Sequence, residues 1–241
     1  VALKYKKWGF AFMTRTYGKL NLVDIDPTLG YAISVGDPTS TDITSGDNQR
    51  LNGTAYGEVA LAASRTFWET DNYKFNAGAT FKLLFPGTYA NIGLDEFEGT
   101  VNTVGGDTYL SNTTANLNIA YSGNLANEFT DVENYYQSVF GSLNGYGVDF
   151  GVNFMIKDAD NGYKLNTGIA IRNIGEMTFK DDNNSSTNYT LTIPEATFLN
   201  PGLNLDVFND IESVEEVEQI LLDSGYLTTI NGKKDFAVKL P

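Results

Sequence analysis

Residues 145–175, GYGVDFGVNFMIKDADNGYKLNTGIAIRNIG, contain two stretches in which large apolar side chains alternate with small or polar ones. In the first stretch the large set is Tyr146, Val148, Phe150, Val152, Phe154 and Ile156. The residues between them are Gly147, Asp149, Gly151, Asn153 and Met155. Because successive side chains of a strand point to opposite faces of the sheet, each stretch predicts a strand with one bulky apolar face and one small polar face.

The connection between these two strands is also specified locally. Asn161 and Gly162 both tolerate a positive φ, so the pair predicts a tight hairpin. The preceding DADNG resembles the start of a calcium loop, but Ile169 stands where such a loop requires a bidentate glutamate. We therefore predict a turn here, and no metal site.

The same two-residue period recurs along most of the chain, with a second well-specified turn at 69–72. It predicts an all-β, antiparallel, up-and-down sheet of about ten strands. We expect these strands near residues 3–20, 52–68, 73–85, 89–103, 108–122, 146–157, 162–180, 188–195, 200–208 and 234–240.

Three segments between the strands have helical signals. The first begins with Asp26 as N-cap and ends at Gly36, and the second, weaker one covers 131–145. The clearest covers 209–225, with Asn209 or Asp210 as N-cap and Gly225 as the stop. Its apolar stripe is Ile211, Val214, Val217 and Leu221. Its acidic residues, expected on the solvated surface, are Glu212, Glu215, Glu216, Glu218 and Asp223.

Composition excludes several classes of function. A formal charge of −14 opposes nucleic-acid binding, which requires clustered lysine and arginine. With neither cysteine nor histidine, the chain lacks thiol chemistry, the commonest metal ligand and the base of a conventional catalytic triad. No apolar run is long enough for a transmembrane helix. We predict a non-enzymatic protein without a cofactor.

Alternating strands form both soluble sandwiches and membrane barrels, and three details favour a transmembrane β-barrel. Charged residues fall on the polar face of the strands, with Arg65 as the exception; that face is otherwise small; and aromatic residues mark strand ends. We predict as lumen-facing Arg15, Glu58, Lys74, Lys82, Asp149, Asn153, Lys164 and Arg172. We predict as lipid-facing Phe10, Phe12, Phe75, Phe81, Val148, Phe150, Val152, Phe154, Leu165, Ile169 and Ile171. We predict as interfacial aromatic residues Trp8, Tyr73, Tyr121, Tyr146 and Tyr163.

The strand ends give a topology. If 73–85 and 89–103 are separate strands, short turns at 69–72, 104–107, 158–161 and 196–199 all fall on one side of the barrel. The three helical segments then lie in long outer loops on the opposite side, as expected for an outer-membrane barrel.

Several stretches resemble a Bacteroidota family of outer-membrane β-barrel proteins of unknown function, itself distantly similar to long-chain fatty-acid transport barrels. The matching stretches are FAFMTRTYGKLNL, RLNGTAYGEVALAASRTF, NAGATFKLL, GYGVDFGVNFMI, LNTGIAIRNIGEMTF and DFAVKLP. The resemblance implies a barrel in the outer membrane of a Gram-negative bacterium. Because family members are longer, it also implies that residues 1–241 are one barrel domain from a longer barrel.

Three functions follow as expectations. The first is a transport-like barrel in outer-membrane lipid that binds or passes a small molecule, hydrophobic molecules included. The second is a non-transporting component of a larger assembly with other envelope proteins. The third is a soluble carbohydrate-binding β-sandwich, in which a second sheet covers the apolar face.

Overall fold

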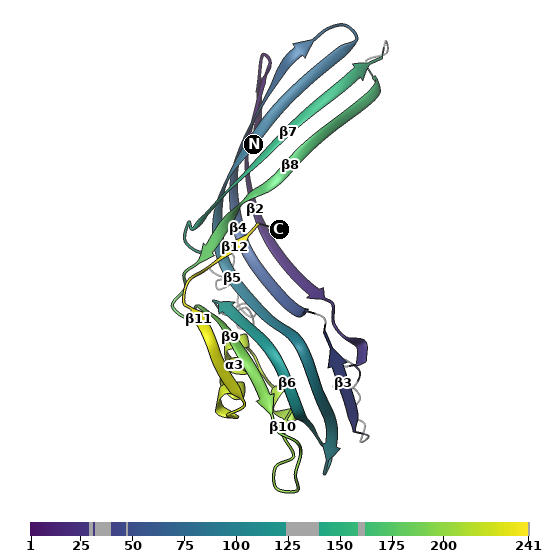
Figure 1. Ribbon diagram of the computed structural model, residues 1–241. Helices are drawn as coiled ribbons and strands as arrows, with labels where there is room; N and C mark the ends of the chain where they lie inside the picture. Colours follow the sequence, from purple (N-terminus) through teal and green to yellow (C-terminus); the bar gives the residue numbers. More distant parts are fainter. Residues whose placement is uncertain (29–30, 32–39, 47, 124–139, 159–161, 241) are drawn as a thin grey trace.

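The computed structural model describes residues 1–28, 31, 40–46, 48–123, 140–158 and 162–240. In these residues the chain forms one twelve-stranded sheet whose paired strands are all antiparallel (Figure 1). The strands are β1 Ala2–Tyr5, β2 Trp8–Val23, β3 Thr41–Ser45, β4 Gln49–Glu69, β5 Tyr73–Val104, β6 Asp107–Ser122, β7 Gly145–Lys157, β8 Tyr163–Phe179, β9 Ser185–Ile193, β10 Leu203–Asn204, β11 Leu227–Lys233 and β12 Phe236–Lys239. The all-β prediction is confirmed. The sheet of the described residues is not closed, so a closed barrel is not shown.

The long strand β5 divides the sheet into two parts. One edge of β5 pairs with β4 over residues 74–94 and with β3 over residues 97–101. The other edge pairs with β7 over 73–84 and with β6 over 89–104. We call residues 85–88 the fork, because the partner of this edge changes there from β7 to β6. We call the part above it in Figure 1, with β1, β7 and β8, the upper part, and the part with β3, β6, β9, β10 and β11 the lower part.

The fork corrects the predicted topology, because 73–104 is one strand and not two. Pro86 and Gly87 lie between the two predicted strands 73–85 and 89–103. In the structure they lie in the fork, where β5 has no strand partner on one edge, and Gly87 is the extra residue of a bulge against β4. The turns at 70–72 and 105–106 consequently lie at opposite ends of the sheet, so the prediction of all short turns on one side is wrong (Figure 1).

Several strand boundaries also differ from the prediction. The first predicted strand is a hairpin, since Lys6 has a φ of 54° and β1 folds back onto β2. The strands β3 and β11 were not predicted. The predicted strand 200–208 contains only the two residues of β10 before the 3-10 helix η2, Asp206–Phe208.

Helix α3, Val214–Asp223, is the clearest predicted helix but begins later than expected. Its N-cap is Ser213, whose hydroxyl accepts a hydrogen bond from the Glu216 backbone N–H at 3.1 Å, and not Asn209 or Asp210. Gly225 follows its end with a φ of 76°. At Asp26 the carboxylate accepts a hydrogen bond from the Thr28 N–H, as an N-cap does, but most of that predicted helix and of 131–145 lies outside the described residues.

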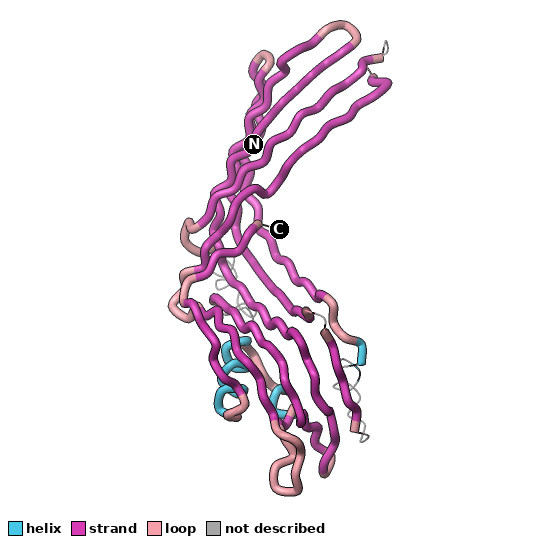
Figure 2. The backbone as a smooth tube through the Cα atoms, in the orientation of Figure 1, coloured by secondary structure: helices cyan, strands magenta, loops and turns pink. Residues whose placement is uncertain are grey.

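The main apolar core lies between α3 and the lower part. Val217 and Leu221 of α3 pack with Leu117, Ile119 and Leu191, which lie on one face of β6 and β9. Figure 2 shows the described helical segments confined to this part of the molecule. The predicted stripe of α3 is thus its packed face, because burial of apolar area stabilises the docked helix.

Glu218 corrects the prediction that every acidic residue of this helix is solvated. Its carboxylate is buried and accepts hydrogen bonds from the hydroxyls of Tyr121 at 2.8 Å and Tyr189 at 2.6 Å. Burial, reinforced by the hydrogen bond to Glu218, raises the pKa of Tyr189 to about 12. The Tyr189 hydroxyl therefore remains a donor at neutral pH, and a buried carboxylate needs such donors.

We expect Leu221→Ala to lower the free energy of unfolding of the lower part by about 2–5 kcal/mol, because it leaves a cavity under α3. Leu222→Ala on the same helix is the control. Leu222 is 39% exposed, so the change should stay within about 0.5 kcal/mol. Urea denaturation with hydrogen exchange of the α3 amides measures both. Equal effects of the two substitutions would show that α3 is not docked by this face.

Candidate functional site

The two faces of the upper part differ sharply. One face carries the large apolar residues, and most of those predicted as lipid-facing are exposed: Phe150 is 52% exposed and Ile169 is 72% exposed. Also exposed are Phe10, Phe12, Phe81, Val152, Leu165 and Ile171. Phe75, Val148 and Phe154 lie half-buried among their neighbours on the same face. No second layer of the described residues covers Phe150, so in this structure these side chains have no protein core to join.

The predicted interfacial aromatic residues behave differently in the two parts. Trp8, Tyr73, Tyr146 and Tyr163 are exposed in the upper part. Tyr121 is buried in the lower part, and its predicted interfacial position is wrong because α3 covers it.

Arg65, the charged exception on the apolar face, lies over two aromatic rings. Its guanidinium carbon is 5.2 Å from the Trp8 ring centroid and 5.5 Å from that of Phe67. These cation–π contacts explain how this face accommodates a cation.

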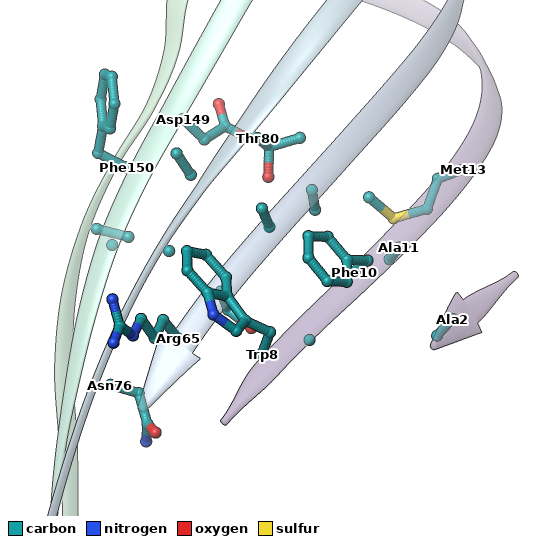
Figure 3. Close-up of a pocket in the computed structure, with 18 of the residues that line it drawn as sticks. Ala2, Trp8, Phe10, Ala11, Met13, Arg65, Asn76, Thr80, Asp149 and Phe150 are labelled. Carbon is teal, nitrogen blue, oxygen red and sulfur yellow. The ribbon is translucent and has the colours of Figure 1, made fainter. Parts of the chain in front are cut away.

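The opposite, polar face of the upper part contains a groove of about 930 Å³. Small residues form much of its lining, among them Gly9, Ala11, Ala62, Gly78 and Gly151. Figure 3 shows Met13, Thr80 and Asp149, from β2, β5 and β7, among the side chains around it. The hollow exists because four neighbouring strands, β2, β4, β5 and β7, carry small side chains at this level of the polar face.

A network of four charged groups from four strands lies at the lower end of this groove. The Lys82 Nζ is 2.8 Å from the Asp149 Oδ1 and 3.9 Å from the Glu58 Oε2, and the Arg15 Nη1 is 3.4 Å from the Glu58 Oε1. The side chains of Glu58 and Lys82 are only 2% and 4% exposed. Such deeply buried charges persist only when they are paired and hydrogen-bonded.

Asn173 completes this network and was not predicted from the sequence. Its side-chain oxygen accepts a hydrogen bond from the Lys82 Nζ at 2.6 Å, and its backbone N–H donates to the Asp149 Oδ1 at 2.7 Å. A φ of 59° places it at an irregularity between β7 and β8. The residue type tolerates this conformation, but no local pattern in the sequence indicates that the strand is irregular here.

The other predicted polar-face residues lie outside the network. Lys74 pairs with Glu69 at 3.6 Å, and Lys164 pairs with Asp158 at 3.8 Å, both near the upper hairpins. Asn153 joins a row of amides, accepting a hydrogen bond from Asn76 at 3.3 Å and donating one to Asn166 at 2.7 Å. Arg172 is exposed and lines the groove. The predicted set has five basic and two acidic residues, and the partners of Lys74 and Lys164 are carboxylates outside that set, Glu69 at the end of β4 and Asp158 just after β7.

An apolar cluster closes the polar face just below the network. Tyr56, Leu84, Met177, Phe179 and Leu240 are buried together there. The strand β12, paired with the end of β8, carries Phe236 and Val238 against the cluster. A strand near residues 234–240 was predicted from the sequence. The position of β12 across the polar face depends on its long-range pairing with β8, which the sequence does not reveal.

Among the described residues no group of three His, Cys, Asp or Glu side chains could hold an ion. None of the helices described here has the length and apolar character to cross a membrane.

We expect Lys82→Met to lower the free energy of unfolding by about 3–5 kcal/mol, because it removes the cation between two carboxylates, one of them fully buried. The control is Lys164→Met, whose 67% exposed side chain should contribute no more than about 0.5 kcal/mol. Trp8 and Trp68 both lie in the upper part and report its urea denaturation by fluorescence. A Lys82→Met protein as stable as the Lys164→Met protein would contradict a structural role for the network.

Comparison with known proteins gives a family for the chain. No curated protein and no solved structure matches it. A family of unknown function, DUF5723, matches residues 1–240, which is almost the whole chain. The open sheet with one exposed apolar face and one polar, ion-paired face is therefore the structure of a member of the DUF5723 family.

Proposed function

We propose that the upper part lies in the outer membrane of a Gram-negative bacterium, with its apolar face against lipid. The observation that carries the proposal is the exposure of Phe150, Ile169 and their neighbours on one face. Exposed apolar patches of this extent occur where a protein meets a membrane or another protein. Charged residues on the opposite face of the same strands favour the membrane, because they avoid the lipid side.

The extent of the apolar face fits a bilayer. It is bare along β7, which has 13 residues, and a tilted strand needs about 9–11 residues to cross the hydrocarbon core. On β4 and β5 the same face continues below the fork, where α3 covers part of it. A membrane boundary near the fork accounts for this change, because apolar side chains outside the lipid need a protein cover.

The proposal includes closure of the sheet into a barrel. Above its four-residue pairing with β12, one edge of β8 has no partner among the described residues, and β2 pairs with β1 only over 8–11. Unpaired backbone N–H and C=O groups are not tolerated in lipid. Further strands must therefore pair with these edges in the membrane, supplied by the same polypeptide or by another chain.

Within this barrel the groove on the polar face is the candidate site for a transport-like function. Small side chains and an adjacent ion network provide space and polarity for a small molecule, hydrophobic molecules included. A relation to fatty-acid transport barrels and an origin in Bacteroidota, both expected from the sequence resemblance, remain parts of this proposal.

A second candidate function is a non-transporting component of an outer-membrane assembly. The observation that favours it is the apolar cluster of Tyr56, Leu84 and Phe179 below the ion network, which blocks the polar face between the two parts. Charged groups on α3 and the lower loops would then contact other envelope proteins.

Ile169→Arg separates a membrane face from a water-exposed face. Because Ile169 is 72% exposed, the substitution costs little in water, but near the bilayer centre we expect a cost of about 2–4 kcal/mol. Ala170→Arg, on the opposite face of the same strand, is the matched control. The measurement is the folded fraction in lipid vesicles, from the mobility difference of boiled and unboiled samples. A wild-type protein that folds and stays soluble without detergent, unaffected by either arginine, would refute the membrane proposal.

Liposome swelling distinguishes the two candidate functions. If the barrel transports, vesicles containing it should swell in small neutral solutes faster than empty vesicles. Tyr56→Ala and Phe179→Ala together should increase the rate further, because they open the apolar cluster. No swelling with either protein, in vesicles shown to contain folded barrel, would favour the non-transporting component.

A further inference from the structure

The lower part carries a row of asparagine side chains that runs across six strands. They are Asn21 of β2, Asn52 of β4, Asn91 of β5, Asn118 of β6, Asn188 of β9 and Asn231 of β11. The register pairs Asn21 with Asn52, Asn52 with Asn91, Asn118 with Asn188 and Asn188 with Asn231. Because paired residues share a face, the row lies on one side of the sheet. On β4 this is the side of Glu58, opposite to α3.

The amides are joined by hydrogen bonds that all have the same direction. Asn91 donates to Asn118 at 2.8 Å, Asn118 to Asn188 at 2.8 Å, and Asn188 to Asn231 at 2.7 Å. At the other end Asn21 donates to Asn52 at 3.4 Å, and Asn52 donates to the Tyr89 hydroxyl at 2.8 Å. Each amide has two N–H groups and two acceptor lone pairs, so these bonds leave further capacity on every amide. The bonds also hold the amides in fixed orientations.

A cavity of about 440 Å³ lies beside the row. Arg50, Asp95, Asn116, Asn118 and Asn188 contribute to its lining. The hollow is present because Gly93 has no side chain. A Cβ at Gly93 would lie 3.6 Å from both the Arg50 Nε and the Asn118 Cβ, which is ordinary contact distance. A larger side chain at Gly93 would therefore extend into the cavity without a clash at its Cβ.

The chemistry of this lining selects a class of ligand. The charged side chains of the lining are one guanidinium and one carboxylate, which balance, and its five asparagine amides both donate and accept; Leu117, Tyr189 and Ile230 also contribute to it. An apolar ligand would leave the remaining donors and acceptors of these groups unpaired, and a charged ligand would find no excess of opposite charge among the lining residues. A ligand with many hydroxyl groups and no charge satisfies both conditions. Strands place successive amides about 4.8 Å apart, so an extended chain of such groups can meet several of them.

We propose that the asparagine row and the cavity at Gly93 bind a neutral oligosaccharide. The row supplies donors and acceptors to successive sugar hydroxyls, Asp95 accepts from a hydroxyl pair, and Arg50 donates to ring or hydroxyl oxygens. This site is separate from the groove of the upper part, and the apolar cluster lies between them. The proposal holds whether or not the upper part lies in a membrane, so failure of the vesicle experiments leaves it intact.

The test is calorimetric titration of the full chain with malto-, cello-, manno- and xylo-oligosaccharides, and with oligogalacturonate as a charged analogue. We expect at least one neutral series to bind. Gly93→Val, which fills the cavity, and Asn118→Ala, which removes the central amide, should each weaken binding by about tenfold or more, as for the loss of about 1.4 kcal/mol. Gly93→Val keeps every amide of the row, so it tests the cavity even if Asn118→Ala fails to fold.

Two matched controls should bind as the wild type does. Gly18→Val introduces the same side chain on the opposite face of β2, where a Cβ meets no atom within 4 Å. Asn166→Ala removes an amide from the row of the upper part. The proposal is overturned if no neutral series binds at millimolar concentrations, if the charged analogue binds more tightly, or if Gly93→Val and Asn118→Ala, shown to be folded by circular dichroism, bind like the controls.

Discussion

The pairing of β5 with β4 through the fork is the constraint on which the rest of the structure depends. A strand has two edges. One edge of β5 pairs with β4 on both sides of the fork, and further along with β3, while the partner of the other edge changes from β7 to β6. The bulge at Gly87 allows the backbone to continue through this change. It also keeps the faces of the two strands in agreement, because β4 pairs with β2 without a shift over residues 50–65 while β5 shifts by one residue at Gly87. Both parts of the sheet therefore share one polar face and one apolar face.

These two faces meet different surroundings above and below the fork. The apolar face is bare in the upper part, whereas in the lower part α3 buries much of it through Val217 and Leu221. Because Glu218 is buried when α3 docks, its carboxylate needs hydrogen-bond donors, and two tyrosine hydroxyls provide them. The apolar face of the same strands is therefore covered by a helix in the lower part and exposed in the upper part.

The polar face is divided in a comparable way. Its upper groove ends at the ion network around Lys82, the apolar cluster follows, and the asparagine row lies beyond it. The charges are paired where they are buried, since an isolated buried ion is costly. In the lower part, uncharged amides form hydrogen bonds with one another across the strands, and an uncharged group carries no such cost. The strand β12 separates the two regions because it lies against the cluster through Phe236 and Val238.

The sequence by itself determined the local features of this protein. Alternation over 145–157 predicted β7 and its two faces, because side-chain direction in a strand follows from position alone. The stripe from Ile211 to Leu221 predicted α3 and its packed face for the equivalent reason in a helix. The capping-box spacing of Ser213 and Glu216 was also present in the sequence, and it would have indicated the correct start of α3. Only the tertiary structure decided that 73–104 is one strand, that Tyr121 and Glu218 are buried, and that Asn173 joins Lys82 to Asp149. Each of these features depends on contacts with residues far away along the chain. The pattern of a single strand does not specify which strands will pair with its edges, nor whether a helix or solvent will cover its faces.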